Sequence, residues 1–277
     1  MLPNLIVIGA AKSGTTSLHE YLDLHPEISM SREKELNFFL EDANWSRGRQ
    51  WYERQFQSAP VRGESSPAYS AYPLRSGVPK RMAATLSDVR LVYVVRDPID
   101  RIVSHYVHRA LAWSDVETIA EALADPVVRE WLVKPSCYWL QLEQYFEYFP
   151  RERVLVLDSD QLRAHREETL AAVFRFVGVD DSFRTAQFAL AHNAETGRTK
   201  PTRTGLRVST ALDRTLGPAR AQVLRERAPR ALKARLRQAT PQPVLDDTLR
   251  EELADELRPE VERLRAETGL PFSGWSL

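Results

Sequence analysis

The residues best suited to hold an anion lie near the start of the chain, in the turn Ala11-Lys12-Ser13-Gly14-Thr15-Thr16. The apolar run 5–8 before this turn predicts a short buried strand, and residues 17–24 after it predict a helix. The first N–H groups of a helix have no intrahelical partner and carry the positive end of the helix dipole, so they attract anions. The turn adds a full positive charge from Lys12, and hydroxyl donors from Ser13, Thr15 and Thr16. It is therefore predicted to cradle a phosphate group.

This turn differs from the common nucleotide-binding P-loop, G-x-x-x-x-G-K-[ST], in the position of its lysine. Gly9 and Gly14 have the P-loop separation, but Thr15 occupies the position of the P-loop lysine and Lys12 lies inside the loop. In P-loop enzymes that lysine contacts the β- and γ-phosphates, and the next hydroxyl binds Mg²⁺. The shifted lysine indicates a nucleotide with a different reacting end. The alternative is that the glycine and threonine residues only form a structural turn.

A second candidate position for an anion follows the apolar run 89–95, which predicts another buried strand. Arg96-Asp97-Pro98 ends this run, and the proline suits the first turn of a helix expected over residues 100–112. Ligands of open parallel sheets bind at the carboxyl ends of the strands, so Arg96 is expected beside the Lys12 turn. The alternative is a structural ion pair between Arg96 and Asp97.

The helix expected after Arg96 carries two further polar candidates. Ser104 lies about two turns into this helix, and His108 lies one turn further along the same face. Both side chains can therefore reach one ligand. The alternative for His108 is a surface position on the helix.

Composition narrows the class of protein. The 277 residues suit a single domain, 1–277, in which residues from about 205 onward form a helical extension. Basic and acidic residues balance at 38 each, so a nucleic acid is not expected as the partner. The single cysteine, Cys137, excludes an internal disulfide framework and favours a reducing, cytoplasmic location. No run of about 18 apolar residues is present to span a membrane, and no secretory signal is visible.

Apolar runs alternate with amphipathic segments along most of the chain. Further strands are predicted shortly after His25-Pro26, over residues 61–69 where a strand runs into a turn, and over 153–157. Helices are predicted over residues 50–56, 75–86, 115–149, 167–177, 219–236 and 246–267, with an irregular polar stretch over 192–206. This alternation favours an α/β fold with a central, mostly parallel sheet flanked by helices.

The two candidate anion sites resemble those of sulfotransferases that use 3′-phosphoadenosine 5′-phosphosulfate (PAPS). The turn 11–18 is similar to their 5′-phosphosulfate loop, and Arg96-Asp97-Pro98 with Ser104 is similar to their 3′-phosphate site. Other shared motifs indicate the glycan branch, which comprises the heparan sulfate N- and 3-O-sulfotransferases and bacterial relatives. These motifs are His25-Pro26, Glu35-Leu36-Asn37-Phe38-Phe39, Ser66-Pro67-Ala68-Tyr69, Tyr138 with Phe149-Pro150, and the segment 269–275. The resemblance covers most of the chain and implies a P-loop-like, three-layer fold.

The resemblance also implies a role for each site residue in moving a sulfuryl group from PAPS to an acceptor. Lys12 would neutralise charge on the bridging oxygen as adenosine 3′,5′-bisphosphate leaves. The 5′-phosphate would be held by Ser13, Gly14, Thr15 and Thr16, and the 3′-phosphate by Arg96 and Ser104. Glu35 matches the family's general base, and His108 matches a histidine at the N-sulfotransferase active site. No metal is expected, because Lys12 would take the role of Mg²⁺.

Two departures from the family pattern affect these expectations. The glycan enzymes usually have a lysine after the glutamate that corresponds to Glu64, whereas this chain has Ser65. The missing cation weakens the case for a polyanionic, heparan-like acceptor. The family's late cofactor loop reads Lys-Gly-Arg, whereas this chain has Thr196-Gly197-Arg198-Thr199-Lys200. Gly197, Arg198 and Lys200 are expected to contact the donor, with Lys200 supplying the missing charge.

The acceptor implied by the resemblance is a glycan or small molecule that offers a hydroxyl or an amine. The segments 35–51, 69–77 and 110–139 are expected to line its site. Two alternatives stay open: a kinase-type transferase with an atypical phosphate loop, and a non-catalytic nucleotide-binding protein on the same fold. The sequence indicates neither a particular acceptor nor an oligomeric state.

Overall fold

The computed structural model describes residues 1–110, 118–189, 199–201, 237–239 and 243–277, together with the single residues 208, 212 and 215. A sheet of five parallel strands, in the order β2-β3-β1-β4-β5, forms the centre of the described part. Its strands are β1 (Leu5–Gly9), β2 (Ile28–Met30), β3 (Val61–Ser65), β4 (Arg90–Val95) and β5 (Val154–Asp158). The predicted α/β fold with a parallel sheet is confirmed.

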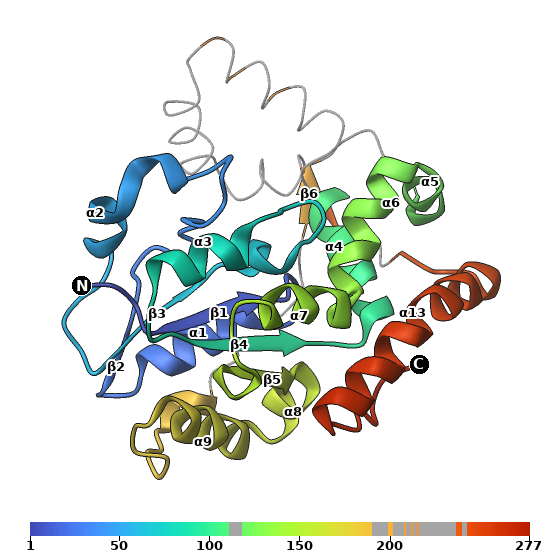
Figure 1. Ribbon diagram of the computed structural model, residues 1–277. Helices are drawn as coiled ribbons and strands as arrows, with labels where there is room; N and C mark the ends of the chain where they lie inside the picture. Colours follow the sequence, from blue (N-terminus) through green and yellow to red (C-terminus); the bar gives the residue numbers. More distant parts are fainter. Residues whose placement is uncertain are drawn as a thin grey trace.

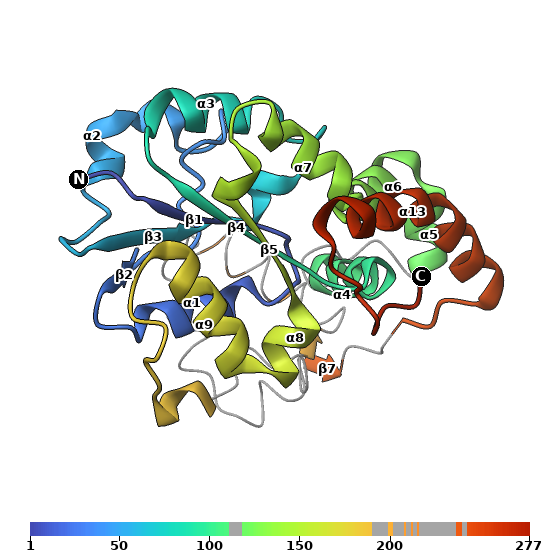
Figure 2. The same cartoon turned by 60° about the horizontal axis from the view of Figure 1, so that its bottom comes forward.

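Helices cover both faces of this sheet (Figures 1 and 2). One face carries α1 (Thr15–Asp23), α8 (Ser159–Ala164) and α9 (Arg166–Val177). The other face carries α2 (Gly48–Glu53), α3 (Val78–Thr85) and α7 (Tyr138–Phe146). A third group lies beside the carboxyl end of β4 and comprises α4 (Pro98–Ala110), α5 (Ile119–Ala124), α6 (Pro126–Val133) and α13 (Asp247–Thr268).

Short elements complete the described chain. The 3₁₀ turns are η1 (Trp45–Arg47), η2 (Pro67–Ser70), η3 (Lys134–Ser136), η4 (Arg151–Arg153) and η5 (Ala186–Ala189). A separate antiparallel pair joins β6 (Thr199–Pro201) to β7 (Arg237–Ala239). No helix in these ranges is long and apolar enough to cross a membrane.

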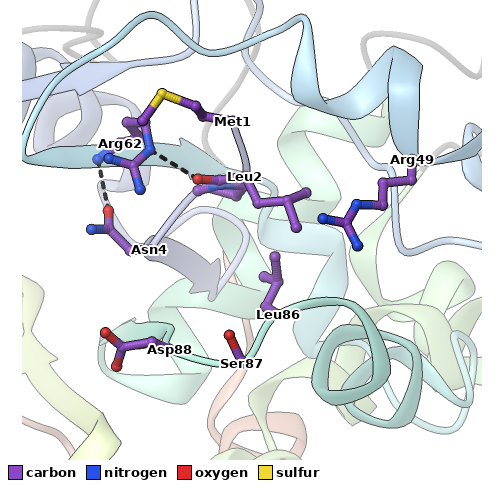
Figure 3. A pocket seen from close by; sticks show the side chains of 9 residues that line it. Met1, Leu2, Asn4, Arg49, Arg62, Leu86, Ser87 and Asp88 are labelled. Carbon is purple, nitrogen blue, oxygen red and sulfur yellow. Dashed lines mark hydrogen bonds between the residues drawn. The ribbon is translucent and has the colours of Figure 1, made fainter.

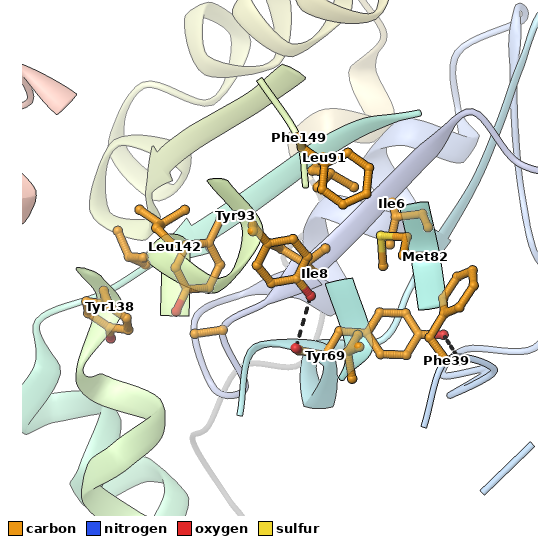
Figure 4. Close-up of a cluster of buried hydrophobic side chains, with 14 of the residues drawn as sticks. Ile6, Ile8, Phe39, Tyr69, Met82, Leu91, Tyr93, Tyr138, Leu142 and Phe149 are labelled. Atoms are coloured by element: carbon orange, nitrogen blue, oxygen red, sulfur yellow. Dashed lines mark hydrogen bonds between the residues drawn. The ribbon is translucent and has the colours of Figure 1, made fainter. Parts of the chain in front are cut away.

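The strands are buried on both faces, which explains why they read as continuous apolar runs. In β1, Ile6 and Ile8 point into the cluster that packs under α3 and α7, whereas Leu5 and Val7 point into the cluster under α1 and α9. Figure 4 shows the first of these clusters, in which Tyr138 from α7 lies near β4. The sheet is therefore a rigid platform whose carboxyl edge positions the loops that follow each strand.

The apolar stripe predicted for the last helix is confirmed in α13. Leu253 and Leu257 pack with α4–α6, and Val261 and Leu264 pack with the cluster beneath α3 and α7. The chain then turns at Gly269, whose φ is 69°, and returns toward the carboxyl edge of the sheet. This return brings the last residues of the chain to the end of β4.

Two predictions about secondary structure are wrong in part. The single helical segment predicted over 115–149 is divided into α5, α6 and α7, because Thr118 and Glu121 form a capping box and Asp125 caps a new helix before a proline. Residues 199–201, predicted as irregular, form β6. Its partner β7 lies far along the chain, where local sequence gives no signal. The helix predicted over 219–236 lies outside the described residues.

Candidate active site

The end of β1 is shaped by a glycine whose backbone conformation and close neighbours disfavour any side chain. Gly9 has a φ of 155°, and a Cβ there would lie 1.9 Å from Ser70 Oγ. The following amide, Ala10 N, donates to Val94 O in β4 over 2.6 Å. The phosphate loop therefore starts from a point that is held against the neighbouring strand.

The loop itself has the backbone expected of an anion site. Lys12 and Gly14 both adopt left-handed conformations, with φ of 73° and 91°, and such alternating turns direct backbone N–H groups to one side. Gly14 caps α1, whose first hydrogen bond runs from Leu18 N to Gly14 O over 3.1 Å. The N–H groups of residues 15–17 therefore form the positive end of a nine-residue helix.

Tyr138 connects this loop with the end of β4. Its phenol donates to Arg96 O over 2.8 Å. Burial raises the pKa of Tyr138 to about 12, against opposing effects from the Arg101 charge, the backbone of Arg96 and the nearby Ser13 side chain. Ser13 and Arg96 therefore both adjoin one phenol, so the two candidate anion sites lie together at the carboxyl edge of the sheet.

Asp97 caps α4 and holds the chain's last residues. One carboxylate oxygen accepts from Asp100 N over 2.9 Å. The other accepts from the backbone N and hydroxyl of Ser276 over 2.5 and 2.7 Å. Arg96 is instead 3.3 Å from the carboxylate of Asp100, a partly exposed pair of the kind that contributes little stability. The Arg96 guanidinium is thus bound to an exposed carboxylate. A ligand phosphate could replace this carboxylate as its partner.

Helix α4 carries more nitrogen-bearing side chains near Ser104 and His108 than the sequence predicted. Ser104 is buried at 5% exposure and His108 is exposed. Arg101 is fully buried, and its Nη1 lies 3.3 Å from His105 Nδ1. The spacing of Arg101, His105 and His108 at i, i+4 and i+7 is a signal for one basic helix face that the sequence reasoning missed.

His105 is an imidazole whose pKa is lowered mainly by burial. The charges of Arg101, Arg109, His108 and Lys12 act in the same direction, and together these effects bring the pKa to about 2. Lys12 is one of the charges that act on His105, so the phosphate loop lies near the basic face of α4. An anion bound there would relieve this mutual repulsion.

His105 should make the protein's stability depend on pH. The imidazole has a pKa of about 2 when folded and about 6.5 when unfolded, so the unfolded chain binds more protons between these values. The free energy of unfolding is therefore unaffected by His105 above about pH 6.5. As the pH falls below this value, it decreases by up to about 1.4 kcal/mol per pH unit. Urea unfolding at several pH values should show a shallower acid decline for His105→Gln than for the wild type. The same change at the exposed His165 is the control, and an equal decline in all three proteins would contradict the assignment.

Glu35 begins a segment that is fixed to the turn after β3. Its side chain is 44% exposed and lies 3.3 Å from Lys34 Nζ. Asn37 N donates to Ser66 Oγ over 3.0 Å, and Phe39 N donates to Tyr69 OH over 3.3 Å. Because β3 pairs with β1, this segment lies on the other side of β1 from β4. Glu35 is thus accessible, on a backbone held at the carboxyl edge of the sheet.

Ser65 occupies an internal position. It is fully buried, and its Oγ lies 3.0 Å from His19 Nδ1. Burial and, to a smaller extent, the charge of Lys34 lower the pKa of His19. The residue that stands in place of the family's lysine therefore contacts a helix α1 side chain, and the ammonium nearby belongs to Lys34.

The three segments expected to line the acceptor site do meet. Arg75, from the turn after η2, forms an ion pair with Asp42. Its guanidinium carbon is 5.5 Å from the centre of the Trp131 ring, and that of Arg109 is 5.2 Å from the same ring. The tryptophan in α6 therefore joins α4 to the segments 35–51 and 69–77.

A pocket at the opposite edge of the sheet lacks these features (Figure 3). It is lined by residues 1–4, Arg49, Arg62 and residues 86–88. Arg62 is bonded to the backbone oxygens of Leu2, Ala59 and Pro60, and Asp88 pairs with Arg153. The charged side chains of Arg62 and Asp88 thus bind other parts of the protein near the amino ends of the strands. This pocket is therefore a poor candidate for the reaction site.

The structure describes only one of the three donor contacts predicted for the late loop. Gly197 and Arg198 lie outside the described residues, and Lys200 belongs to β6. Among the residues with described positions, no group of three or more His, Cys, Asp or Glu side chains could hold a metal ion. The expectation of a metal-free reaction stays a prediction.

The parallel sheet, the glycine-bounded loop after β1 and the flanking helices define a P-loop-like α/β protein. The Sulfotransferase domain family matches residues 2–195, more than half of the chain, and the protein belongs to this family of transferases. The resemblance noted in the sequence is thereby confirmed.

Curated relatives include enzymes named for heparan sulfate. The chain is 31% identical over 211 residues to heparan sulfate glucosamine 3-O-sulfotransferase 5 of Mus musculus, covering 71% of this chain and 58% of that protein. It is 28% identical over 198 residues to the bifunctional heparan sulfate N-deacetylase/N-sulfotransferase 2 of Homo sapiens, covering 64% of this chain and 22% of that protein. The chain thus spans less than two thirds of the length of these relatives.

A crystal structure of a sulfotransferase from Alicyclobacillus acidocaldarius has the same fold. The two chains superpose with a TM-score of 0.61 at 24% identity, covering 84% of this chain and 99% of the other. This likeness supports the three-layer architecture and nothing finer.

Proposed function

We propose that this sulfotransferase moves a sulfuryl group from PAPS to a hydroxyl or amine of a carbohydrate or a glycosylated small molecule. The observation that carries the proposal is the meeting of the Lys12 loop and the end of β4 at Tyr138. Two anion sites on neighbouring strands suit a nucleotide with a 5′ and a 3′ phosphate. The positive groups around His105 favour such a ligand further.

In the proposed reaction, the acceptor oxygen or nitrogen attacks the sulfur. The bond between the sulfur and the bridging oxygen breaks, and adenosine 3′,5′-bisphosphate leaves. Glu35 takes the proton of the acceptor, and Lys12 stabilises the negative charge that develops on the bridging oxygen. As in phosphoryl transfer, positioning and charge stabilisation supply most of the rate enhancement.

The remaining residues would hold the donor. The N-terminus of α1, with Gly14, Thr15 and Thr16, would bind the 5′-phosphate through N–H and hydroxyl donors, with Ser13 in the same loop. Arg96 and Ser104 would bind the 3′-phosphate, which distinguishes PAPS from ATP. Gly197, Arg198 and Lys200 are proposed as further donor contacts, and His108 as a second catalytic group near the acceptor.

The acceptor is proposed from the names of the relatives and from two features of the site. The names of the relatives refer to heparan sulfate, and the guanidinium groups of Arg75 and Arg109 over the Trp131 ring would offer hydrogen-bond donors to a polar acceptor. Ser65, buried against His19, supplies no charge for a polyanion. A sugar or glycoside of low charge therefore fits better than a heparan-like chain. A cytoplasmic location remains part of the proposal.

Calorimetric titration with adenosine 3′,5′-bisphosphate and with ATP–Mg²⁺ tests the donor. We expect tight binding of the first and weak binding of the second. Incubation with labelled PAPS and a panel of sugars, glycosides and amines, followed by mass analysis, then tests transfer. Tight binding of ATP–Mg²⁺ alone would indicate a kinase-type protein, and binding without transfer to any acceptor would indicate a non-catalytic one.

A further inference from the structure

Glu64, at the carboxyl end of β3, is a carboxylate with no exposure to solvent. Its Oε1 accepts hydrogen bonds from the hydroxyls of Tyr52 and Tyr69, and its Oε2 accepts one from Ser66 over 2.7 Å. Burial raises the pKa of Glu64, and these three hydrogen bonds act in the opposite direction. A buried carboxylate is unfavourable unless such donors satisfy it. Three hydroxyls from separate positions converge here to do so.

Two of these hydroxyls extend the network to the segment that begins with Glu35. Ser66 Oγ accepts from Asn37 N over 3.0 Å. Tyr69 OH accepts from Phe39 N over 3.3 Å, and Figure 4 shows these two residues side by side. A hydroxyl has one proton, and in both residues Glu64 receives it, so the oxygen is left to accept. An ionised carboxylate can only accept, so it fixes the direction of every hydrogen bond in the network.

The backbone held in this way turns sharply at Asn37. Its φ of 48° lies in the left-handed region, which asparagine adopts more readily than most side-chain-bearing residues. Leu36 O is bound by Asn44 Nδ2 over 2.8 Å, and the Phe38 ring stacks on Tyr52 with centroids 4.1 Å apart. The residues after Glu35 are therefore held from both sides, while the Glu35 side chain projects from their exposed end.

We infer that Glu64 is a positioning residue for the general base, which acts through Ser66 and Tyr69 on the backbone that carries Glu35. This inference rests on the proposed function, because it assigns Glu35 the role of accepting the proton. Glu64 itself touches no substrate. Its carboxylate sets where the segment 35–39 lies relative to the carboxyl edge of the sheet, and so where the base meets the acceptor.

A double-mutant cycle with Glu35 tests this inference. Glu64→Gln keeps the shape of the side chain but cannot accept at both of its terminal atoms. It should lower kcat about tenfold, because misplacing a catalytic group slows the reaction, and leave the Kd for adenosine 3′,5′-bisphosphate unchanged within about twofold. In a Glu35→Gln background the same change should have no further effect on kcat. A loss by the same factor in both backgrounds would show a merely structural role and overturn the inference.

A second variant and a control keep the test independent of folding. Ser66→Ala removes one branch of the network and should show the same coupling to Glu35 with a smaller loss. Tyr145→Phe removes a buried hydroxyl that bonds the backbone oxygen of Tyr69 over 3.0 Å, and leaves in place the Tyr69 hydroxyl through which Glu64 is connected to Phe39 N. It should lower the melting temperature without coupling to Glu35.

Amide hydrogen exchange separates the failure of this inference from the failure of the proposed function. In Glu64→Gln and Ser66→Ala the amide of Asn37 should exchange faster than in the wild type, whether or not sulfate is transferred. Unchanged exchange there would overturn the network. A wild-type protein that transfers no sulfate would overturn the proposed function, and the link from Glu64 to catalysis with it, even if exchange is faster.

Discussion

Replacing Lys12 by alanine is expected to slow sulfate transfer by about 10²–10³, the usual effect of removing one group that stabilises transition-state charge. Lys12 lies in the loop after β1, and its charge reaches the basic face of α4. Alanine keeps the Cβ that Lys12 already carries at a φ of 73°, so the change adds no backbone strain. Single-turnover rates at saturating PAPS should fall, whereas the Kd for PAPS should change much less.

Arg96→Ala is the contrasting variant, because a phosphate contact made equally in the ground state and the transition state affects binding alone. We expect its Kd for adenosine 3′,5′-bisphosphate to rise about tenfold to a hundredfold, as for the loss of one charged hydrogen-bonding partner. The single-turnover rate at saturation should change little. Lys80→Ala, at an exposed position on α3, controls for loss of a positive charge. Equal losses of rate and affinity in both variants would contradict this division of roles.

Much of this site could be predicted because its parts are local. A strand that ends in a small-residue turn, or in Arg96-Asp97-Pro98, can be read from a few neighbouring residues. The rule that ligands lie at the carboxyl ends of parallel strands then places both at one edge. The predicted start of the first helix was two residues late because Gly14, in a left-handed conformation, caps α1 directly before Thr15. Such a cap gives no side-chain signal.

The features that the sequence did not predict depend on packing between distant segments. Ser66 and Tyr69 follow Glu64 in the next turn, but Tyr52 reaches it from α2, and the complete burial of this carboxylate depends on the packing of the whole sheet edge. Arg101 looks like any helix-surface residue until Leu132 and Ser136 are seen to bind its guanidinium. No local pattern predicts that a charged residue is buried, so the internal contacts of Glu64 and Arg101 could not be predicted from the sequence.

Glu35→Gln is expected to lower the rate of transfer to an alcohol acceptor by about 10²–10⁴, the usual contribution of a general base. The amide has nearly the same shape as the carboxylate but cannot take a proton. Because Glu35 is 44% exposed and lies outside the Lys12 loop, donor affinity should be retained. The measurement is the single-turnover rate at saturating PAPS, with the Kd for adenosine 3′,5′-bisphosphate determined in parallel.

The choice of acceptor distinguishes proton transfer from any other role of Glu35. A phenolic acceptor gives up its proton more easily than a sugar hydroxyl, so the loss caused by Glu35→Gln should be much smaller with the phenol. Glu33→Gln, an exposed carboxylate two residues earlier in the same loop, should leave both rates close to those of the wild type. If the two acceptors lost the same factor in Glu35→Gln, the carboxylate would be binding or orienting the acceptor. The base would then have to be sought among the other groups at this edge, beginning with His108.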